Sequence, residues 1–362
     1  MESRLVLDAR AALDAAFPAA RPASVAFAPG RVNLIGEHVD YNDGVVMPMP
    51  LALGTAVAVR GNGAGRIRAA SRDLAGDGFV GYVRALSAAL AAEGFATPAF
   101  DAGIAGDLPI GGGLSSSASL LVACARALAA EFALPLDDAE IARIAHRAET
   151  EGVGVRCGIM DHFAIALGRP RHALLLDCRD RSTRQVPLPP GLAVVVVDSG
   201  TRRELTESRY NERVEDCAAA ASALGVRSLR DATRARLDEG GGRLAPRARD
   251  RARHVIDEIA RVRAFADALA RRDLVRAGDL VNESHASCRD LYEISTPILD
   301  ALQSALVAID GVFGARLSGA GFGGCLVALA RAELADAALD AALRDVGDRI
   351  GAAARVLARV TG

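Results

Sequence analysis

Apolar and polar positions alternate in short runs through the first half of the chain. Residues 24–28, 31–35 and 51–60 are rich in β-branched and small apolar side chains, which is typical of strands. A Pro–Gly pair separates the first two runs and predicts a turn there, and a further strand is expected at residues 67–70. The first half therefore begins as a sheet.

Two helices come after these strands. The first is expected to begin near Ser115 or Ser116 and to end near Glu131. The second should begin after Asp137, because Glu140 lies three residues further on at the spacing of a capping box, and the apolar residues after it share one helical face. The first half thus combines strands with at least two helices.

The second half shows longer helical periodicity between a few strands. A buried strand is expected first, and a pair of strands on either side of a glycine turn should come near the end. The predicted strands are 192–198, 314–317, 325–330 and 354–360, and the predicted helices are 204–224, 251–271, 296–307 and 334–350.

A proline-rich loop at residues 181–191 separates the two halves. At 362 residues and 37.5 kDa, the chain is long enough to divide into two lobes with substantial cores. We therefore expect an α+β protein with lobes at residues 1–186 and 187–362.

Charge excludes some classes of partner and site. The 43 basic and 45 acidic residues nearly balance, with a net charge of -2, so we expect no nucleic-acid or membrane partner. All 43 basic residues are arginine, which excludes a Walker A loop and Schiff-base chemistry, since both need lysine. An arginine-rich stretch at 230–253 contains enough acidic residues to be interpreted as a solvated loop and helix face.

The location of the protein is inferred from its N-terminus and its cysteines. The first ten residues lack the apolar stretch of a secretory signal, and no apolar run reaches the roughly 20 residues of a membrane helix. The six cysteines are widely spaced and form no zinc-binding pattern. We expect a cytoplasmic protein with reduced thiols, and a monomer or at most a weak homo-oligomer.

Residues 109–119, with the sequence PIGGGLSSSAS, form the first segment that could bind a ligand. Glycines let the backbone approach a ligand closely, and the free amides at the start of the following helix favour an anion such as phosphate. Serine hydroxyls could add a magnesium ligand. The alternative is a capped helix after a flexible turn.

A second segment, residues 28–42, is dense in polar side chains. Arg31, Asn33, Glu37, His38 and Asp40 lie there among few aliphatic residues. Such a group of donors and acceptors suits a polyhydroxylated ligand, because every buried polar atom needs a partner. The alternative is a set of surface charges with an ordinary loop histidine.

Two further features complete the candidate site. Asp161 lies among apolar residues, where a carboxylate is paired, functional or a helix cap, and Glu149 ends the second predicted helix. The glycine-rich loop at 318–325 is either a tight hairpin or a place where backbone approaches a phosphate or sugar.

In this order, the segments resemble the GHMP small-molecule kinases, and among them the galactokinases. Residues 31–42 are similar to the galactokinase signature, 113–119 to the ATP loop of the family, and 319–324 to its third motif. Stretches at 157–161, 210–213 and 282–287 are also galactokinase-like. The resemblance spans residues 24–330, almost the whole chain.

The resemblance implies a fold and an activity. The fold would have an N-terminal lobe like ribosomal protein S5 domain 2 and a ferredoxin-like C-terminal lobe, with the active site between them. The reaction would transfer phosphate from ATP, with Mg²⁺, to the C1 hydroxyl of galactose in the Leloir pathway. The family binds phosphate without a Walker lysine, in agreement with the absence of lysine here.

The resemblance also assigns residues. Asp161 matches the catalytic aspartate beside the C1 hydroxyl, and Arg31 matches the arginine that contacts both this aspartate and the transferred phosphoryl group. Ser117 and Glu149 match the magnesium ligands. Sugar binding would involve Arg31, Glu37, His38, Asp40, Gly158, Asp161 and Tyr210, and ATP binding Pro109, Gly111, Gly112, Gly113, Leu114, Ser115, Ser116, Ser117, Ala118, Ser119 and Gly321.

Three residues depart from the galactokinase pattern. Val39 replaces a usual threonine, Arg156 a common asparagine and His162 a usual glutamine. The last two could favour an anionic sugar, so a kinase for galacturonate, N-acetylgalactosamine or arabinose is one alternative. A sugar sensor without catalysis is another, although it would not need Asp161, Ser117 and Glu149.

Overall fold

The computed structural model describes residues 3–74, 78–201 and 206–362, and the chain forms two compact units that alternate along the sequence. Unit 1 comprises Met1–Arg31, Pro50–Ile110 and Ser115–Gly168, and unit 2 comprises Val32–Met49, Gly111–Leu114 and Arg169–Gly362. Both units combine helices with sheets, so the predicted α+β class is confirmed. The lobe boundary after residue 186 stays a prediction.

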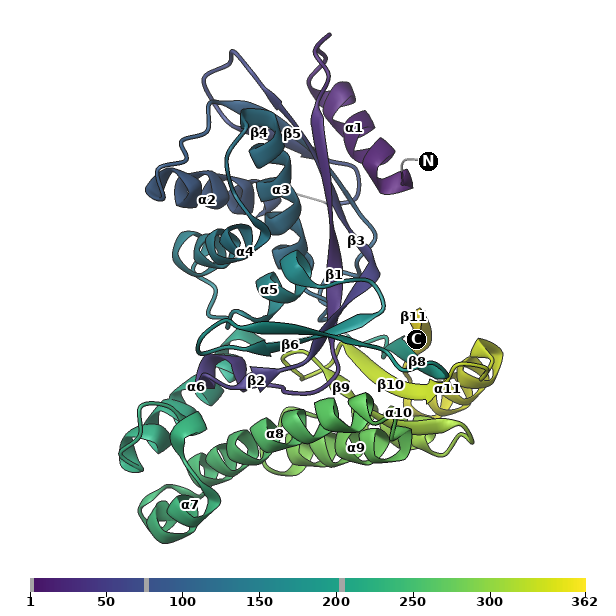
Figure 1. Cartoon of the computed structure of the whole chain (residues 1–362). Coiled ribbons are helices and arrows are strands. Elements are labelled where there is room, and N and C mark those ends of the chain that lie inside the picture. The colour runs from purple at the N-terminus through teal and green to yellow at the C-terminus, as the bar shows by residue number, and fades with distance from the viewer. Residues whose placement is uncertain (1–2, 75–77, 202–205) are drawn as a thin grey trace. The chain divides into compact units, whose positions relative to one another are not determined.

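Unit 1 is built on a four-stranded sheet (Figure 1). Its strands are β1 (Ser24–Asn33), β3 (Pro48–Gly61), β5 (Phe100–Gly106) and β4 (Arg68–Ser71), in that spatial order. β3 and β5 are antiparallel, and β4 runs parallel to β5. The predicted strands at 51–60 and 67–70 correspond to β3 and β4.

The turn predicted at Pro29–Gly30 is wrong, because β1 continues through both residues as one strand. β1 lies at the edge of its sheet. Proline lacks a backbone N–H, and an edge strand tolerates this because one side of it has no ladder to complete. This continuity carries β1 directly to Arg31.

Helices lie on both sides of the unit 1 sheet in Figure 1, with α1 (Arg4–Ala16) on one side. A Cβ at Gly103 of β5 would lie 2.3 Å from the Ala9 carbonyl oxygen, so a glycine allows α1 to approach the sheet closely. The other side carries α2 (Gly78–Ala92), α3 (Ser116–Phe132), α4 (Asp138–Arg147) and α5 (Met160–Leu167).

The two helices predicted after the strands are confirmed as α3 and α4. The Asp137 side chain accepts from the Glu140 amide at 2.8 Å, and Glu140 accepts from the Asp137 amide at 2.8 Å, which completes the capping box. α4 then continues into a π-helical turn, η2 (Ala148–Val153), a form of helix that often occurs at functional sites.

The described residues of unit 2 form two sheets. The larger one has the order β11-β8-β10-β9 and is antiparallel throughout. Its strands are β8 (Leu192–Asp198), β9 (Val312–Ser318), β10 (Cys325–Arg331) and β11 (Arg355–Thr361), which confirms the four strands predicted in this half. The smaller sheet joins β2 (Val45–Val46), β6 (His172–Asp177) and β7 (Thr183–Pro187). The loop predicted at 181–191 is therefore wrong over β7, which pairs with β6.

Helices pack against these sheets: α9 and α10 contact β9, and α8 contacts α9 and the smaller sheet. α8 begins at Pro246, five residues before its predicted start, because proline fits the first turn, where no amide is needed. The helices of unit 2 are α6 (Thr206–Ala223), α7 (Arg234–Gly240), α8 (Pro246–Ala270), α9 (Leu274–Asp290), α10 (Pro297–Val307) and α11 (Asp336–Ile350).

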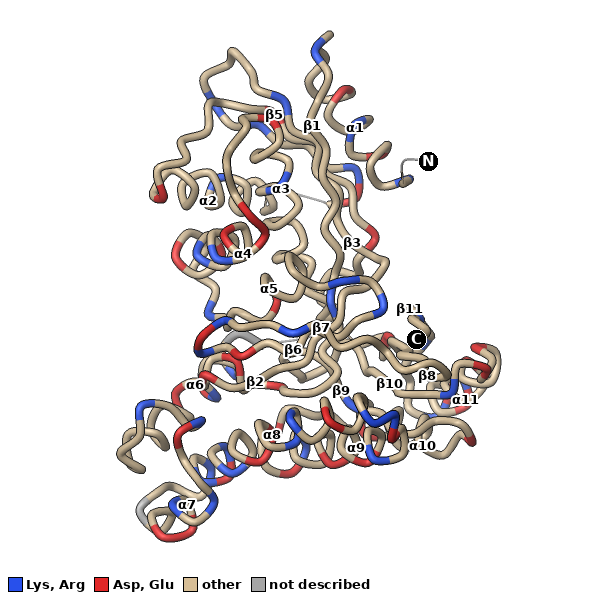
Figure 2. The backbone as a smooth tube through the Cα atoms, viewed as in Figure 1, with Lys and Arg blue, Asp and Glu red and all other residues tan. Residues whose placement is uncertain are grey.

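Charges of both signs follow each other along α8 and α9 (Figure 2). Within the arginine-rich stretch, Arg234 pairs with Asp257 at 2.5 Å. This pair agrees with the interpretation of the stretch as a solvated face. Arg251 contradicts it: this side chain is 1% exposed and pairs with Glu293. Within the described ranges, no helix is long and apolar enough to cross a bilayer.

Candidate active site

Asp161 and Arg31 form a two-point ion pair in unit 1. Asp161 lies in the first turn of α5, and Arg31 near the end of β1. Arg31 Nε donates to Asp161 Oδ1 at 2.8 Å and Nη2 donates to Oδ2 at 2.9 Å. Arg31 is 4% exposed, whereas the Asp161 side chain is 27% exposed. The carboxylate is therefore fixed in orientation while part of it stays accessible.

The surroundings of Asp161 keep it ionised. Burial alone would raise the pKa of Asp161, but the Arg31 charge and a hydrogen bond from Ser115 Oγ together hold this pKa below its ordinary value. A carboxylate of low pKa is a good hydrogen-bond acceptor and a weak base. Such a group can orient a hydroxyl, and a weak base accepts a proton only late in a reaction.

The glycine-rich segment leads into the N-terminus of α3. Gly111 and Gly113 have φ of +74° and +80°, and Ser115, directly before the helix, has φ of +60°. The first amides of a helix lack partners within it, and the helix dipole is positive at that end. A 17-residue helix after such a turn is suited to bind an anionic group.

Glu149 lies in η2, which packs against α3, the helix that carries Ser117. Glu149 is 5% exposed, and its Oε2 lies 2.8 Å from His162 Nε2. A hydroxyl and a carboxylate are hard oxygen donors, which suits Mg²⁺, since this ion keeps waters and phosphate oxygens as further ligands. Among the described residues, no cluster of three histidine, cysteine or acidic side chains could hold a metal.

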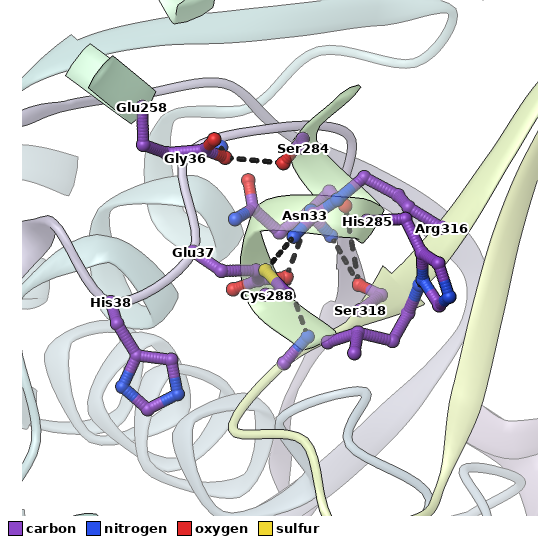
Figure 3. A network of polar contacts seen from close by, with 12 residues as sticks. Asn33, Gly36, Glu37, His38, Glu258, Ser284, His285, Cys288, Arg316 and Ser318 are labelled. Atoms are coloured by element: carbon purple, nitrogen blue, oxygen red, sulfur yellow. Dashed lines mark hydrogen bonds and ion pairs between the residues drawn. The ribbon is translucent and has the colours of Figure 1, made fainter. Parts of the chain in front are cut away.

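In unit 2, Glu37 lies in a buried network of polar contacts (Figure 3). Glu37 Oε1 accepts from the Gly319 amide at 2.7 Å and lies 3.2 Å from Arg316 Nη1. The Glu37 and Arg316 side chains are 2% and 0% exposed. Glu37 thus connects the 28–42 segment to the glycine-rich loop after β9.

Glu258 of α8 also contacts the 28–42 segment, through the Gly36 amide. Its Oε1 accepts from the Gly36 amide at 2.9 Å and from Ser284 Oγ at 2.6 Å, and its Oε2 pairs with Arg261. Burial alone would raise the pKa of Glu258, but the positive charges around it, Arg261 first, lower this pKa to about 2. The Glu258 carboxylate therefore stays ionised, and it accepts from the Gly36 amide as an anion.

His254, one turn before Glu258, contacts the neighbouring backbone. Its Nε2 lies 3.1 Å from the Glu37 carbonyl oxygen, and its Nδ1 lies 2.8 Å from Ser287 Oγ. Burial lowers the pKa of His254 to about 4. A neutral ring that donates through Nε2 and accepts through Nδ1 satisfies both partners.

The His38 ring lies among aromatic side chains of unit 2. Its centroid is 5.3 Å from that of Tyr210 and 4.9 Å from that of Tyr292. Its Nδ1 lies 2.8 Å from Tyr41 Oη and its Nε2 lies 3.1 Å from the Ala320 carbonyl oxygen. The structure thus brings together His38 and Tyr210, two of the predicted sugar residues.

The remaining predicted residues lie on short turns. Asp40 begins η1 (Asp40–Asn42) and is partly exposed, and Gly158 lies just before α5. Gly321 has φ of +81°, and a Cβ there would lie 2.4 Å from the Ile294 carbonyl oxygen, so only glycine fits.

Three family models match the chain: "Galactokinase galactose-binding signature" over residues 13–61, "GHMP kinases N terminal domain" over 80–169 and "GHMP kinases C terminal" over 265–349. A curated galactokinase of Roseiflexus sp. (strain RS-1) is 43% identical over 326 residues, which cover 85% of this chain and 83% of that protein. The chain belongs to the galactokinase family.

Solved structures agree with this membership. The crystal structure of Lactococcus lactis galactokinase complexed with galactose matches with a TM-score of 0.91 and 30% identity, over 97% of this chain and 96% of that one. Methanococcus jannaschii mevalonate kinase matches with a TM-score of 0.64 and 20% identity, over 95% of this chain and all of that one, which shows a shared fold. The predicted GHMP kinase fold is confirmed.

The matched ranges contain most residues assigned to this galactokinase family member by resemblance. The galactose-binding signature covers Arg31, Glu37, His38 and Asp40, and the N-terminal model covers Glu149 and Asp161. The C-terminal model covers the third glycine motif at 319–324. The roles of the individual residues stay predictions.

Sequence reasoning missed the residues that support the galactokinase signature loop, namely Glu258, His254 and Arg316. One signal was available for two of them. His254 and Glu258 are four residues apart on α8, in the same stripe as the buried Val255, Ile259 and Val262. A charged residue inside an apolar stripe indicates a buried polar partner.

Proposed function

We propose that this protein transfers the γ-phosphoryl group of ATP to the C1 hydroxyl of D-galactose, in the first step of galactose use by the Leloir route. The observation that carries the proposal is the Arg31–Asp161 pair, with its partly accessible carboxylate, in a chain of the galactokinase family. Galactose is also the ligand of the Lactococcus lactis relative.

Asp161 would orient the sugar hydroxyl that attacks the γ-phosphorus. Phosphoryl transfer passes through a loose transition state, so positioning and neutralisation of charge supply most of the rate. The lowered pKa of Asp161 makes it an acceptor for the hydroxyl hydrogen rather than a strong base. Arg31 would hold this carboxylate and neutralise the phosphoryl oxygens.

The glycine-rich loop and the start of α3 would bind the phosphates of ATP, as their backbone conformation supports. Ser117 and Glu149 would hold Mg²⁺, which supplies charge neutralisation at the phosphates when it is bound. His162, 2.8 Å from Glu149 Oε2, would keep this carboxylate oriented.

Glu37, His38, Asp40, Gly158 and Tyr210 would bind the ring hydroxyls of the sugar. A pocket of fixed donors and acceptors discriminates strongly, because a sugar with one hydroxyl inverted leaves buried groups unpaired. Since these residue types are intact, galactose is the first choice rather than its C4 epimer.

One observation favours a neutral sugar over galacturonate. His162 is fully buried, and its ring nitrogen faces the Glu149 carboxylate. Because this ring is buried against a carboxylate of the protein, it offers no exposed contact to a sugar carboxylate. Arg156 is exposed and stays the one departure that could contact an anionic sugar.

The test is ADP release from Mg-ATP with galactose, glucose, N-acetylgalactosamine, galacturonate and arabinose. Asp161→Asn should lower turnover on the order of a thousandfold, and Asp345→Asn, which changes an exposed aspartate of α11, is the matched control. Turnover with galactose alone supports the proposal, and turnover with galacturonate alone would reassign the substrate. Galactose binding without turnover would instead identify a sensor.

We also propose a cytoplasmic monomer. The six cysteines lie in the described ranges and form no disulfide, and five of them are buried, which suits a reducing compartment. Light scattering during size-exclusion chromatography would measure the mass directly.

A further inference from the structure

A line of hydrogen-bonding groups leads from the interior of unit 2 to His38. Cys217 Sγ lies 3.1 Å from Tyr292 Oη, which lies 2.8 Å from Tyr41 Oη, which lies 2.8 Å from His38 Nδ1. At the other side of the ring, His38 Nε2 lies 3.1 Å from the Ala320 carbonyl oxygen. We call Cys217, Tyr292 and Tyr41 the relay.

The end at Ala320 fixes one hydrogen, and a neutral His38 ring then sets the direction of the other hydrogen bonds in this line. A carbonyl oxygen only accepts, so His38 Nε2 must carry a hydrogen. In a neutral ring, Nδ1 then has a lone pair and accepts from the Tyr41 hydroxyl. Because the Tyr41 hydroxyl donates its only hydrogen to His38 Nδ1, its oxygen accepts from the Tyr292 hydroxyl. The Tyr292 oxygen in turn accepts from the Cys217 thiol.

The environment of the relay keeps its groups protonated. Tyr292 is 0% and Cys217 2% exposed. Burial, followed by the neighbouring groups, raises the pKa of Tyr41 and of Tyr292 well above the ordinary value, and burial raises the pKa of Cys217 to about 11. Each group can therefore donate at neutral pH.

The backbone at His38 has a strained conformation that these hydrogen bonds can stabilise. His38 has φ of +58°, in the left-handed region that is uncommon for residues other than glycine. A side chain anchored at both ring nitrogens opposes relaxation of this strained backbone. The same contacts tie residues 31–42 to the third glycine motif, since Ala320 belongs to residues 319–324.

We propose that Cys217, Tyr292 and Tyr41 form a one-directional hydrogen-bond relay that holds His38 as a neutral ring with its hydrogen on Nε2. His38 is then a hydrogen-bond donor at Nε2 and never an acceptor there. It donates to Ala320, or to an oxygen of the sugar when one takes that place. Tyr41 and Tyr292 are positioning residues, and their role in sugar binding rests on the proposed function.

Nitrogen-15 NMR of the full-length protein tests the protonation of His38 without any substrate. His38→Asn identifies the His38 signals by their loss. We expect Nδ1 to have the shift of an unprotonated nitrogen that accepts a hydrogen bond, and Nε2 that of a protonated one. Protonation of both nitrogens, or of Nδ1 alone, overturns the proposal, and this measurement needs no variant of the relay.

Tyr41→Phe removes the hydroxyl that faces Nδ1 and keeps the ring. We expect the Nδ1 shift to move toward that of a nitrogen without a hydrogen bond, and the KM for galactose to rise by about tenfold, with the KM for ATP unchanged. Tyr292→Phe should have a smaller effect, because Tyr41 can still donate. Cys178→Ala, which changes a buried thiol of the same unit outside the relay, is the matched control.

The two proposals fail in different ways. If the NMR result is as expected but galactose is not phosphorylated, the relay stands and the proposed function is wrong. If galactose is phosphorylated but Tyr41→Phe leaves the Nδ1 shift unchanged, the relay is wrong and the proposed function stands.

Discussion

The Arg31 guanidinium contacts the Asp161 carboxylate through two nitrogen–oxygen pairs, at 2.8 and 2.9 Å, between residues that are 130 positions apart. Two-point contacts of this kind fix the plane of both groups. Both oxygens of the carboxylate accept from Arg31, so a ligand can contact the accessible part of this group only from a limited set of directions. This geometry supports the proposal that Asp161 acts through orientation at least as much as through basicity.

Asp161→Asn tests this role. Asparagine keeps the size of the side chain, but it removes the negative charge and places an amide group against Arg31. We expect kcat to fall on the order of a thousandfold, while the dissociation constant for galactose changes by less than about threefold. Stopped-flow turnover and calorimetric titration measure the two quantities, and unchanged turnover would show that the assignment is wrong.

The buried pair of Glu37 and Arg316 should contribute strongly to the free energy of unfolding. Arg316→Met leaves the Glu37 carboxylate without its cation, which should cost about 3–5 kcal/mol in the free energy of unfolding. Glu37→Gln in the same chain should restore part of the loss, since no unpaired charge then stays buried. Urea unfolding measures both variants.

The control for this pair is an exposed ion pair. Arg349 lies 2.5 Å from Asp345 on α11, and both side chains are more than half exposed. Arg349→Met should cost less than about 1 kcal/mol, because water screens exposed pairs. Equal losses in Arg316→Met and Arg349→Met would contradict the importance given to burial.

Glu149 and His162 give a prediction for metal binding. Manganese can replace magnesium as a paramagnetic probe, and its binding in the presence of ADP can be followed by electron paramagnetic resonance without turnover. Glu149→Gln should abolish most of the binding, and His162→Leu should weaken it by about tenfold, since it removes the ring that lies 2.8 Å from Glu149 Oε2.

Glu151→Gln is the matched variant for the metal experiment. Glu151 is two residues further along η2, its side chain is 65% exposed, and it pairs with Arg147. Its replacement should leave manganese binding unchanged. If all three variants bind manganese equally well, Glu149 is not a metal ligand.

The residues expected at the site came from contiguous motifs, whereas the residues that hold them come from distant segments. Local sequence predicts α4 because a capping box needs only Asp137 and Glu140. It cannot predict that Glu258 accepts from Gly36, 222 positions away, because nothing within either segment encodes the partner. The turn predicted in β1 failed for a similar reason, since a proline is tolerated there only by the position of the strand in its sheet.

His254 gives a dependence of stability on pH. Its pKa is about 4 in the folded protein and about 6.5 when the chain is unfolded, so the unfolded state binds more protons between these values. The free energy of unfolding should therefore fall as the pH falls from about 6.5 to about 4, with a slope of up to about 1.4 kcal/mol per pH unit from this group. Burial lowers the pKa of His285 to about 4 as well, which adds in the same direction.

Urea unfolding of His254→Gln between pH 7 and pH 4 isolates this contribution. Glutamine does not titrate, so the variant should be less stable at pH 7 and should lose less stability on acidification. His172→Gln, at the start of β6, is the control, and its curve should run parallel to that of the unmodified protein. A His254→Gln curve parallel to both would mean that His254 is not held neutral, and the Glu37 carbonyl would then accept from a charged ring.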